Sequence, residues 1–336
     1  MRNKILLFVL SILFNFNLPA QPPIKIGIIG LDTSHSTAFT KLLNGDETKE
    51  YAGFKIVAAY PYGSKTIKSS YERIPQYTED VKKYGVEIVS SITDLLSKVD
   101  FVMLETNDGN VHLEQAAEVL KAGKTMFIDK PAGASLAQAI AIYDLAKRYN
   151  VPVFSSSSLR FVAQNQKLRN GELGKVLSVD YTSPAVPEPS HPDFSWYGIH
   201  GVEALFTIMG TGCKQVNRMQ SATEDVVVGK WNDERTGVFR GRKSGPMLYE
   251  IYGGTAYTDK GAKPVGGYDG YKVLLDEILK FFKTGITPVS PEETLEIFTF
   301  MEASNESVKK GGKIISMEDT YKKGQKQADK LLKKLW

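Results

Sequence analysis

Two hydrophobic patterns alternate along the first half of the chain. Short apolar runs typical of buried strands occur at residues 24–29, 54–60, 101–105, 125–129 and 151–154. Between them, apolar residues recur at helical spacing over residues 36–43, 112–121 and 136–149. Because strands and helices alternate, the pattern predicts an α/β fold with a doubly wound, parallel sheet and right-handed crossovers over residues 23–155.

The pattern changes near residue 175, where β-branched and aromatic strand signals follow one another with few helices. Expected strands cover residues 176–182, 225–231, 237–242 and 247–252, and expected helices cover 196–209, 271–283, 291–309 and 321–336. This predicts a second, α+β domain over residues 156–336, with a predominantly antiparallel open sheet and a C-terminal helical tail. The glycine-rich residues 253–270 are expected to form a long surface loop, as a plain connection or as a lid.

The N-terminus has the pattern of a secretory signal peptide. Arg2 and Lys4 precede an apolar run over residues 5–14, and the small residue Ala20 follows. The run is too short for the ~20 residues of a membrane-spanning helix. Residues 1–20 are therefore expected to be a cleaved leader of an exported chain, periplasmic or secreted, with no stable membrane insertion.

Charge and cysteine content exclude several classes of partner. Removing Arg2 and Lys4 with the leader lowers the formal charge of the chain from +4 to +2. A nearly neutral protein is not expected to bind nucleic acid. The single cysteine, Cys213, excludes an intramolecular disulfide and a cysteine-cluster metal site, and no metal site is predicted. Cys213 is expected to be a core residue rather than a nucleophile.

Lys130 is the residue that most strongly indicates chemistry. It follows the strand expected at residues 125–129 and precedes Pro131, which restricts the backbone behind it. A side chain at this position lies at the carboxyl edge of a parallel sheet, where open α/β sheets bind ligands. The alternative is a lysine held in an ion pair at the strand end.

Several ordered motifs resemble the Gfo/Idh/MocA oxidoreductases, which include glucose-fructose oxidoreductase and inositol dehydrogenase. Residues 122–131 (AGKTMFIDKP) resemble the family's Ala-Gly-Lys, strand and Glu-Lys-Pro signature, with Asp129 in place of glutamate. The other similar segments are Thr106-Asn107 with His112, Arg160-Phe161, Gly171-Glu172-Leu173-Gly174 and residues 288–292. The resemblance spans nearly all of residues 24–313.

The resemblance implies a Rossmann-like dinucleotide-binding domain, followed by a domain for substrate binding and oligomerisation. It implies NAD or NADP as cofactor, and hydride transfer from a sugar or polyol hydroxyl. Lys130 would lie between nicotinamide and substrate, and His200 would accept the proton. The implied cofactor-binding residues are Gly30, Asp32, Thr33, Ser34, His35, Ser64, Thr106, Asn107, Asp129 and Lys130. The implied substrate-binding residues are Arg160, Trp196, Tyr197 and His200. A homo-oligomer is also implied.

The chain departs from the family pattern where the dinucleotide should bind. A Gly-x-Gly-x-x-Gly turn is expected after the first strand, but residues 30–35 read GLDTSH and keep only Gly30. Asp32 would place a carboxylate near the pyrophosphate, whereas Thr33, Ser34 and Ser36 suit a helix cap or a polar ligand. The second strand is followed by no acidic residue; instead Ser64 and Lys65 give a weak indication of NADP. Trp196 stands where many relatives carry aspartate.

These departures leave three functions open. The first is an exported NAD(P)-dependent oxidoreductase acting on a sugar or polyol. The second is a redox-neutral lyase or glycosidase with bound NAD(P), and the third is a noncatalytic carbohydrate-binding protein on the same fold. Local alternatives also stand: His200 and the aromatic residues around it could be packing residues, and Arg160 could form an interdomain ion pair.

Overall fold

The computed structural model describes residues 22–45 and 49–335, so the expected leader at residues 1–20 lies outside the described residues. The first sheet has six parallel strands in the order β3-β2-β1-β4-β5-β6. Their bounds are β1 (Ile24–Ile29), β2 (Phe54–Tyr60), β3 (Glu87–Ile88), β4 (Phe101–Leu104), β5 (Met126–Asp129) and β6 (Val153–Ser156). This confirms the predicted doubly wound sheet, whose strand order reverses between β1 and β4.

Helices connect these strands, and several begin at a side chain that caps their free backbone N–H groups. Thr33 Oγ1 accepts a hydrogen bond from His35 N at the start of α1, and Asp108 and Ser135 cap α5 and α6 in the same way. The helices are α1 (Ser34–Asn44), η1 (Lys49–Tyr51), α2 (Lys68–Tyr71), α3 (Ile74–Lys82), α4 (Ile92–Lys98), α5 (Gly109–Lys121) and α6 (Leu136–Tyr149). The expected cap at Thr33 is therefore present.

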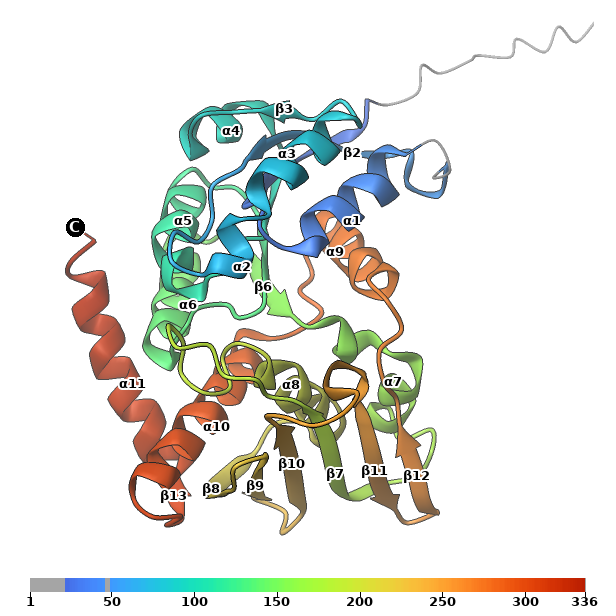
Figure 1. The fold of residues 1–336 in the computed structure, drawn as a ribbon, viewed down its shortest axis with the longest axis vertical. Coiled ribbons are helices and arrows are strands. Elements are labelled where there is room, and N and C mark those ends of the chain that lie inside the picture. Colours follow the sequence, from blue (N-terminus) through green and yellow to red (C-terminus); the bar gives the residue numbers. More distant parts are fainter. Residues whose placement is uncertain (1–21, 46–48, 336) are drawn as a thin grey trace, which may run out of the picture.

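The second sheet has seven strands in the order β12-β11-β7-β10-β9-β8-β13 and lies at the other end of the molecule (Figure 1). All its pairings are antiparallel except that of β7 with β10. The strands are β7 (Val176–Pro184), β8 (Cys213–Gln220), β9 (Glu224–Trp231), β10 (Thr236–Arg242), β11 (Gly253–Thr258), β12 (Gly261–Val265) and β13 (Ile315–Ser316). The expected α+β character with a predominantly antiparallel sheet is confirmed.

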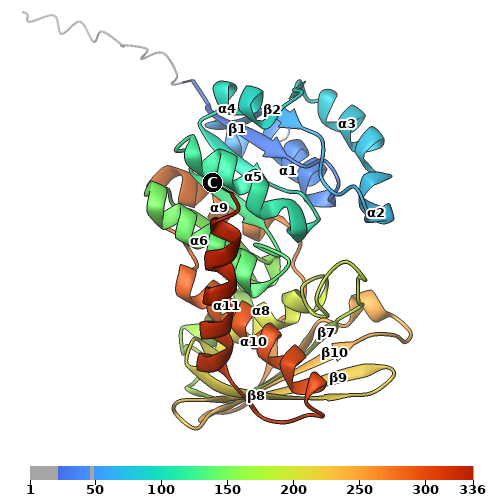
Figure 2. The ribbon, with the colours of Figure 1, turned by 90° about the vertical axis from the view of Figure 1, so that its left-hand side faces the viewer.

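The remaining helices follow β6 in the chain, and some of them pack back on its first half. They are η2 (Ser158–Phe161), α7 (Ala163–Arg169), α8 (Gly198–Met209), η3 (Leu248–Glu250), α9 (Lys272–Thr284), α10 (Pro291–Lys309) and α11 (Met317–Leu332). Leu274 and Ile278 of α9 belong to the same core cluster as Ile26 and Phe39 of the first half. Helix α11 runs back along α6 (Figure 2). The C-terminal part of the chain thus packs on both sheets.

Two segments differ from the sequence prediction. Residues 247–252, expected as a strand, contain the 3-10 helix η3, because Gly245 and Met247 adopt positive φ angles of 127° and 51° that interrupt extended backbone. Within residues 253–270, expected as a loop, residues 253–265 form the β11–β12 hairpin, with Gly261 at φ +90° next to its turn. Strand β8 was not predicted. Among the residues that the structure describes, no helix combines the length and apolar character of a membrane span.

Candidate functional site

A pocket of about 480 Å³ lies between the carboxyl edge of the first sheet and the second half of the chain. Both halves contribute to it, from α1, α2, the loop after β5, η2, α8 and the segment around β11. Its lining residues are Thr33, Ser34, His35, Ser69, Arg73, Asn107, Lys130, Ser158, Leu159, Trp196, Tyr197, His200, Tyr249, Tyr252, Tyr268 and Tyr271. Ligands of open α/β sheets bind at such an edge.

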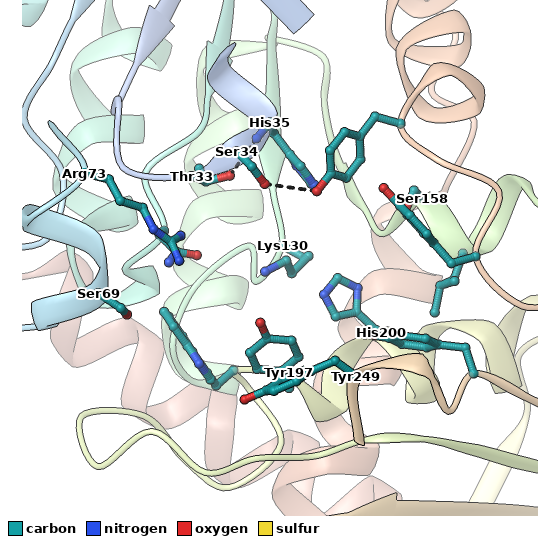
Figure 3. Close-up of a pocket in the computed structure, with 16 residues that line it drawn as sticks. Thr33, Ser34, His35, Ser69, Arg73, Lys130, Ser158, Tyr197, His200 and Tyr249 are labelled. Atoms are coloured by element: carbon teal, nitrogen blue, oxygen red, sulfur yellow. Dashed lines mark hydrogen bonds between the residues drawn. The ribbon is translucent and has the colours of Figure 1, made fainter. Parts of the chain in front are cut away.

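Lys130 and His200 both line this pocket, and Figure 3 draws their side chains next to each other. Lys130 follows β5 directly, and His200 is in the first turn of α8. Nδ1 of His200 lies 2.7 Å from Oγ of Ser157, a hydrogen bond that fixes the ring orientation. Burial and the nearby Lys130 ammonium hold the pKa of His200 well below its usual value. The imidazole is therefore neutral near pH 7 and able to accept a proton.

The pocket is cationic. Arg73 and Lys130 carry positive charge, and none of the described residues that line the pocket is acidic. The first turn of α1 is also present in the lining, and a helix N-terminus favours negative charge. The electrostatic environment therefore suits a ligand with a carboxylate or phosphate group.

Aromatic side chains cover the side of the pocket formed by the second half. Tyr197 contacts Tyr249, with ring centroids 5.2 Å apart, and His200 contacts Tyr252 at 6.5 Å. Tyr249 and Tyr268 are 56% and 50% exposed, so large apolar ring faces remain accessible at the pocket. Aromatic faces beside polar groups are well suited to a sugar ring or a polyol.

Asp32 holds together the three loops that follow β1, β2 and β4. Its side chain is fully buried; Oδ2 accepts a hydrogen bond from Ser64 N at 2.9 Å, and Oδ1 accepts one from Asn107 N at 3.0 Å. Ser64 Oγ donates to Asp108 Oδ2 at 2.9 Å, and Asn107 Nδ2 donates to Ser70 Oγ at 2.9 Å. The crevice between the ends of β1, β2 and β4 is thus filled by the protein's own side chains.

These contacts decide whether a dinucleotide fits. Gly30 keeps the tight first turn: it has φ +92°, and a Cβ there would lie 2.5 Å from Thr106 N. Asp32 and His35, however, stand at the second and third glycine positions, where close approach to pyrophosphate and close helix packing are needed. Both side chains are buried against the ends of neighbouring strands. The residues present do not fit a dinucleotide in the adenosine half of this crevice.

The pKa of Asp32 gives a testable pH dependence. Burial raises it from 3.8 to about 6, although the two backbone hydrogen bonds oppose the shift. Protonated Asp32 therefore contributes to the free energy of unfolding below pH 4. This contribution is lost as the pH rises through 6, because the folded state must then ionise a buried carboxyl. Relative to Asp32→Asn, the unfolding free energy of the wild type should fall between pH 4 and 6.5 by up to about 3 kcal/mol. Urea unfolding of both proteins at several pH values measures this difference, and a constant difference would contradict it.

The predicted site residues separate into two groups. Thr33, Ser34, His35, Asn107, Lys130, Trp196, Tyr197 and His200 line the pocket, whereas Gly30, Asp32, Ser64, Thr106, Asp129 and Arg160 do not. Arg160 is instead 1% exposed and ion-paired with Glu203 and Glu293, at 2.7 Å in each case. Arg160 therefore forms an ion pair rather than lining the pocket, but the pair lies within residues 156–336 and is not the interdomain one that was expected.

The weak indication of NADP is not supported. Ser64 is 2% exposed and its hydroxyl donates to Asp108, so it is not available to a 2′-phosphate. Sequence reasoning also missed Ser69, Arg73 and the tyrosines at positions 249, 252, 268 and 271. They come from segments without a recognisable motif, and only the tyrosine content of residues 249–271 indicated an aromatic surface.

Comparison with known proteins identifies relatives. Residues 24–157 match the model of the GFO_IDH_MocA family, described as an oxidoreductase family with an NAD-binding Rossmann fold. The myo-inositol 2-dehydrogenase of Thermotoga maritima is 30% identical over 182 residues, 51% of this chain and 52% of that protein. The uncharacterized oxidoreductase YhhX of Escherichia coli is 27% identical over 138 residues, 37% of this chain and 40% of that protein. The matches therefore span about half or less of these curated relatives.

Solved structures share the fold over a greater length. The scyllo-inositol dehydrogenase of Lactobacillus casei, solved with NAD(H) and scyllo-inositol, aligns with a TM-score of 0.69 at 16% sequence identity. The alignment covers 88% of this chain and 99% of that structure. At this identity the likeness concerns the fold alone. By sequence, residues 24–157 therefore match the Gfo/Idh/MocA oxidoreductase family, and by structure the chain shares the fold of this solved dehydrogenase.

Proposed function

We propose that the protein is an enzyme that acts on a sugar or polyol carrying an anionic group such as a carboxylate or phosphate. The observation that carries the proposal is that Lys130 and His200 line one pocket, together with Arg73 and an accessible aromatic surface. Neither a packing histidine nor an ion-paired lysine would require an open cationic pocket around both groups. The inositol dehydrogenases among the relatives support a polyol as the substrate class.

The chain's own groups suffice for proton transfer. The neutral ring of His200, oriented by Ser157, would take a proton from a substrate carbon or hydroxyl. The Lys130 ammonium would stabilise the negative charge that develops on the substrate oxygen. Arg73 would bind the anionic group, and Tyr197 and Tyr249 would position the ring of the substrate. Such proton transfer is the first step of a redox-neutral lyase or isomerase reaction.

Ligand titration tests the substrate class. Calorimetry with glucuronate, gluconate, glucose 6-phosphate, glucose and myo-inositol should detect binding of an acidic compound in preference to the neutral ones. Arg73→Gln should weaken that binding about tenfold or more, because it removes a charge-assisted hydrogen bond. Lys65→Gln, an exposed cation outside the pocket lining, is the matched control and should bind normally. Preference for neutral compounds, or equal binding by Arg73→Gln, would contradict the proposal.

The family match favours a second candidate, NAD-dependent oxidation of a polyol. Because the Asp32 contacts fill the adenosine half of the crevice, we expect NAD and NADP to give no heat on titration up to 1 mM, roughly the upper range of typical enzyme KM values. Protein denatured after purification should also release no nicotinamide. Stoichiometric binding or release of either dinucleotide would favour the oxidoreductase and show that the Asp32 contacts open.

Two further expectations remain proposals. The signal-like residues 1–20 support export to the periplasm or medium, which N-terminal sequencing of the mature protein tests: a first residue at Gln21 is expected. Assembly as a homo-oligomer is supported by the family resemblance alone, and the mass in solution tests it.

A further inference from the structure

Three side chains from distant parts of the sequence converge at the carboxyl ends of β1, β4 and β5. His35 is in the first turn of α1, Glu105 directly follows β4, and Asp129 is the last residue of β5. Nδ1 of His35 lies 3.1 Å from Oδ2 of Asp129 and 3.8 Å from Oε2 of Glu105. One potential ligand atom of each residue lies within 4.8 Å of the other two.

The three side chains are buried but unsatisfied. Glu105 is 0%, Asp129 1% and His35 6% exposed. Nδ1 of His35 and all four carboxylate oxygens lack a hydrogen-bond partner among the described residues. Buried polar atoms are normally paired, and an unpaired buried carboxylate is especially unfavourable. The contacts of His35 Nδ1 with Asp129 Oδ2 (3.1 Å) and with Glu105 Oε2 (3.8 Å) account for part of this arrangement, whereas Oε1 of Glu105 and Oδ1 of Asp129 have no partner among the described residues.

A shared proton explains only part of this arrangement. Burial and the neighbouring Asp129 raise the pKa of Glu105 well above its usual value, which favours a proton on this carboxyl. Lys130 stabilises the ionised form of both carboxylates. One proton shared by Glu105 and Asp129, together with an N–H of His35 directed at Asp129 Oδ2, would still leave at least one carboxylate oxygen without a partner.

We propose that His35, Glu105 and Asp129 bind a divalent first-row transition metal ion such as Zn²⁺ or Mn²⁺. One imidazole nitrogen and two carboxylates are donors that such ions accept, and two carboxylate charges balance the charge of the ion. Three protein ligands leave a coordination position free, as in catalytic rather than structural metal sites. Of the three ligands, His35 also lines the pocket, so the site lies directly beneath the wall of the pocket that contains Lys130.

The site also gives a reason for the altered glycine motif. His35 occupies the third glycine position of the dinucleotide turn, and from there its imidazole reaches the ends of β4 and β5. A substrate hydroxyl or carbonyl bound to the ion would be polarised next to His200, which rests on the proposed function. Metal binding itself does not depend on that function and is measured without substrate.

Metal titration of the full chain tests the proposal. Protein dialysed against EDTA and then passed into metal-free buffer should bind one equivalent of Zn²⁺ or Mn²⁺ by calorimetry. Elemental analysis after removal of free ion should find the same ratio, and the melting temperature should rise with metal concentration. Absence of heat, of retained metal and of a thermal shift for both ions would overturn the proposal and leave the shared proton as the explanation.

Variants locate the bound ion. Glu105→Gln keeps the side-chain shape but removes a charged ligand. It should weaken metal binding at least about tenfold, because mutating a residue that only hydrogen-bonds to a ligand already costs about that much affinity. Glu302→Gln is the matched control, because it makes the same substitution at a partly buried glutamate of α10 outside the cluster, and it should bind metal as the wild type does. Unchanged affinity in Glu105→Gln would place the ion elsewhere. If that variant does not fold, Asp129→Asn serves the same purpose. Whether the protein binds metal at all is decided by the wild-type titration.

Discussion

Replacing His200 by asparagine is expected to lower the turnover number by about 100- to 10,000-fold, the usual contribution of a positioned general base. Asparagine retains a polar group that can reach Ser157 but cannot accept and carry a proton near neutral pH. Substrate affinity should change little, because Arg73 and the aromatic side chains are intact. Turnover and dissociation constant are measured on the acidic sugar that the titrations identify.

Two controls separate catalysis from packing. Ser157→Ala frees the His200 ring but leaves the base in place, so its loss of turnover should be much smaller. His191→Gln changes a buried histidine that does not line the pocket, and should leave turnover unchanged once folding is confirmed by circular dichroism. Turnover by His200→Asn within a few-fold of the wild type would remove the acid–base role, whereas a parallel loss of folding would indicate the packing alternative.

The elements with strong local signals were predictable from the sequence. Helices α6 and α10 have the predicted bounds, because Ser135 and Ser290 cap them and apolar residues then recur at helical spacing. Strand β8 was missed because polar residues such as Lys214 and Asn217 alternate with its buried ones, and its apolar content is low. The β11–β12 hairpin was missed because its glycines indicated a loop. Pairing with β7 stabilises it, and pairing between distant strands leaves no local signal.

The candidate site was predictable only in part. A strand-end lysine and a family resemblance identified Lys130 and His200. The cluster of His35, Glu105 and Asp129 is consistent with strand order, since the ends of β1, β4 and β5 are neighbours in a doubly wound sheet, but its three residues belong to separate motifs. The role of Asp32 in holding together the loops after β1, β2 and β4 was not predictable from the sequence. It depends on two backbone N–H groups in distant loops, which have no sequence signature.

Arg160→Met should lower the unfolding free energy by about 3–5 kcal/mol, the usual effect of removing one partner of a buried ion pair. Nε of Arg160 donates to Glu203, and Nη1 donates to Glu293, with all three side chains at most 6% exposed. Arg169 continues to neutralise Glu293, with Nη2 at 2.8 Å from Oε2. The carboxylate of Glu203 would therefore be the one left without a charged partner, retaining only the hydroxyl of Ser156.

Urea unfolding measures the loss, and two comparisons assign it to the buried charge. Lys82→Met removes one partner of an exposed pair with Glu79 and should have a much smaller effect. Combining Arg160→Met with Glu203→Gln should recover a substantial part of the lost stability, because the uncompensated carboxylate is then absent. A loss for Arg160→Met no larger than that for Lys82→Met would contradict the structural role. Since Arg160, Glu203 and Glu293 belong to η2, α8 and α10, a confirmed loss would mean that this ion-pair network holds together the region between the two sheets, and with it the pocket that Lys130 and His200 share.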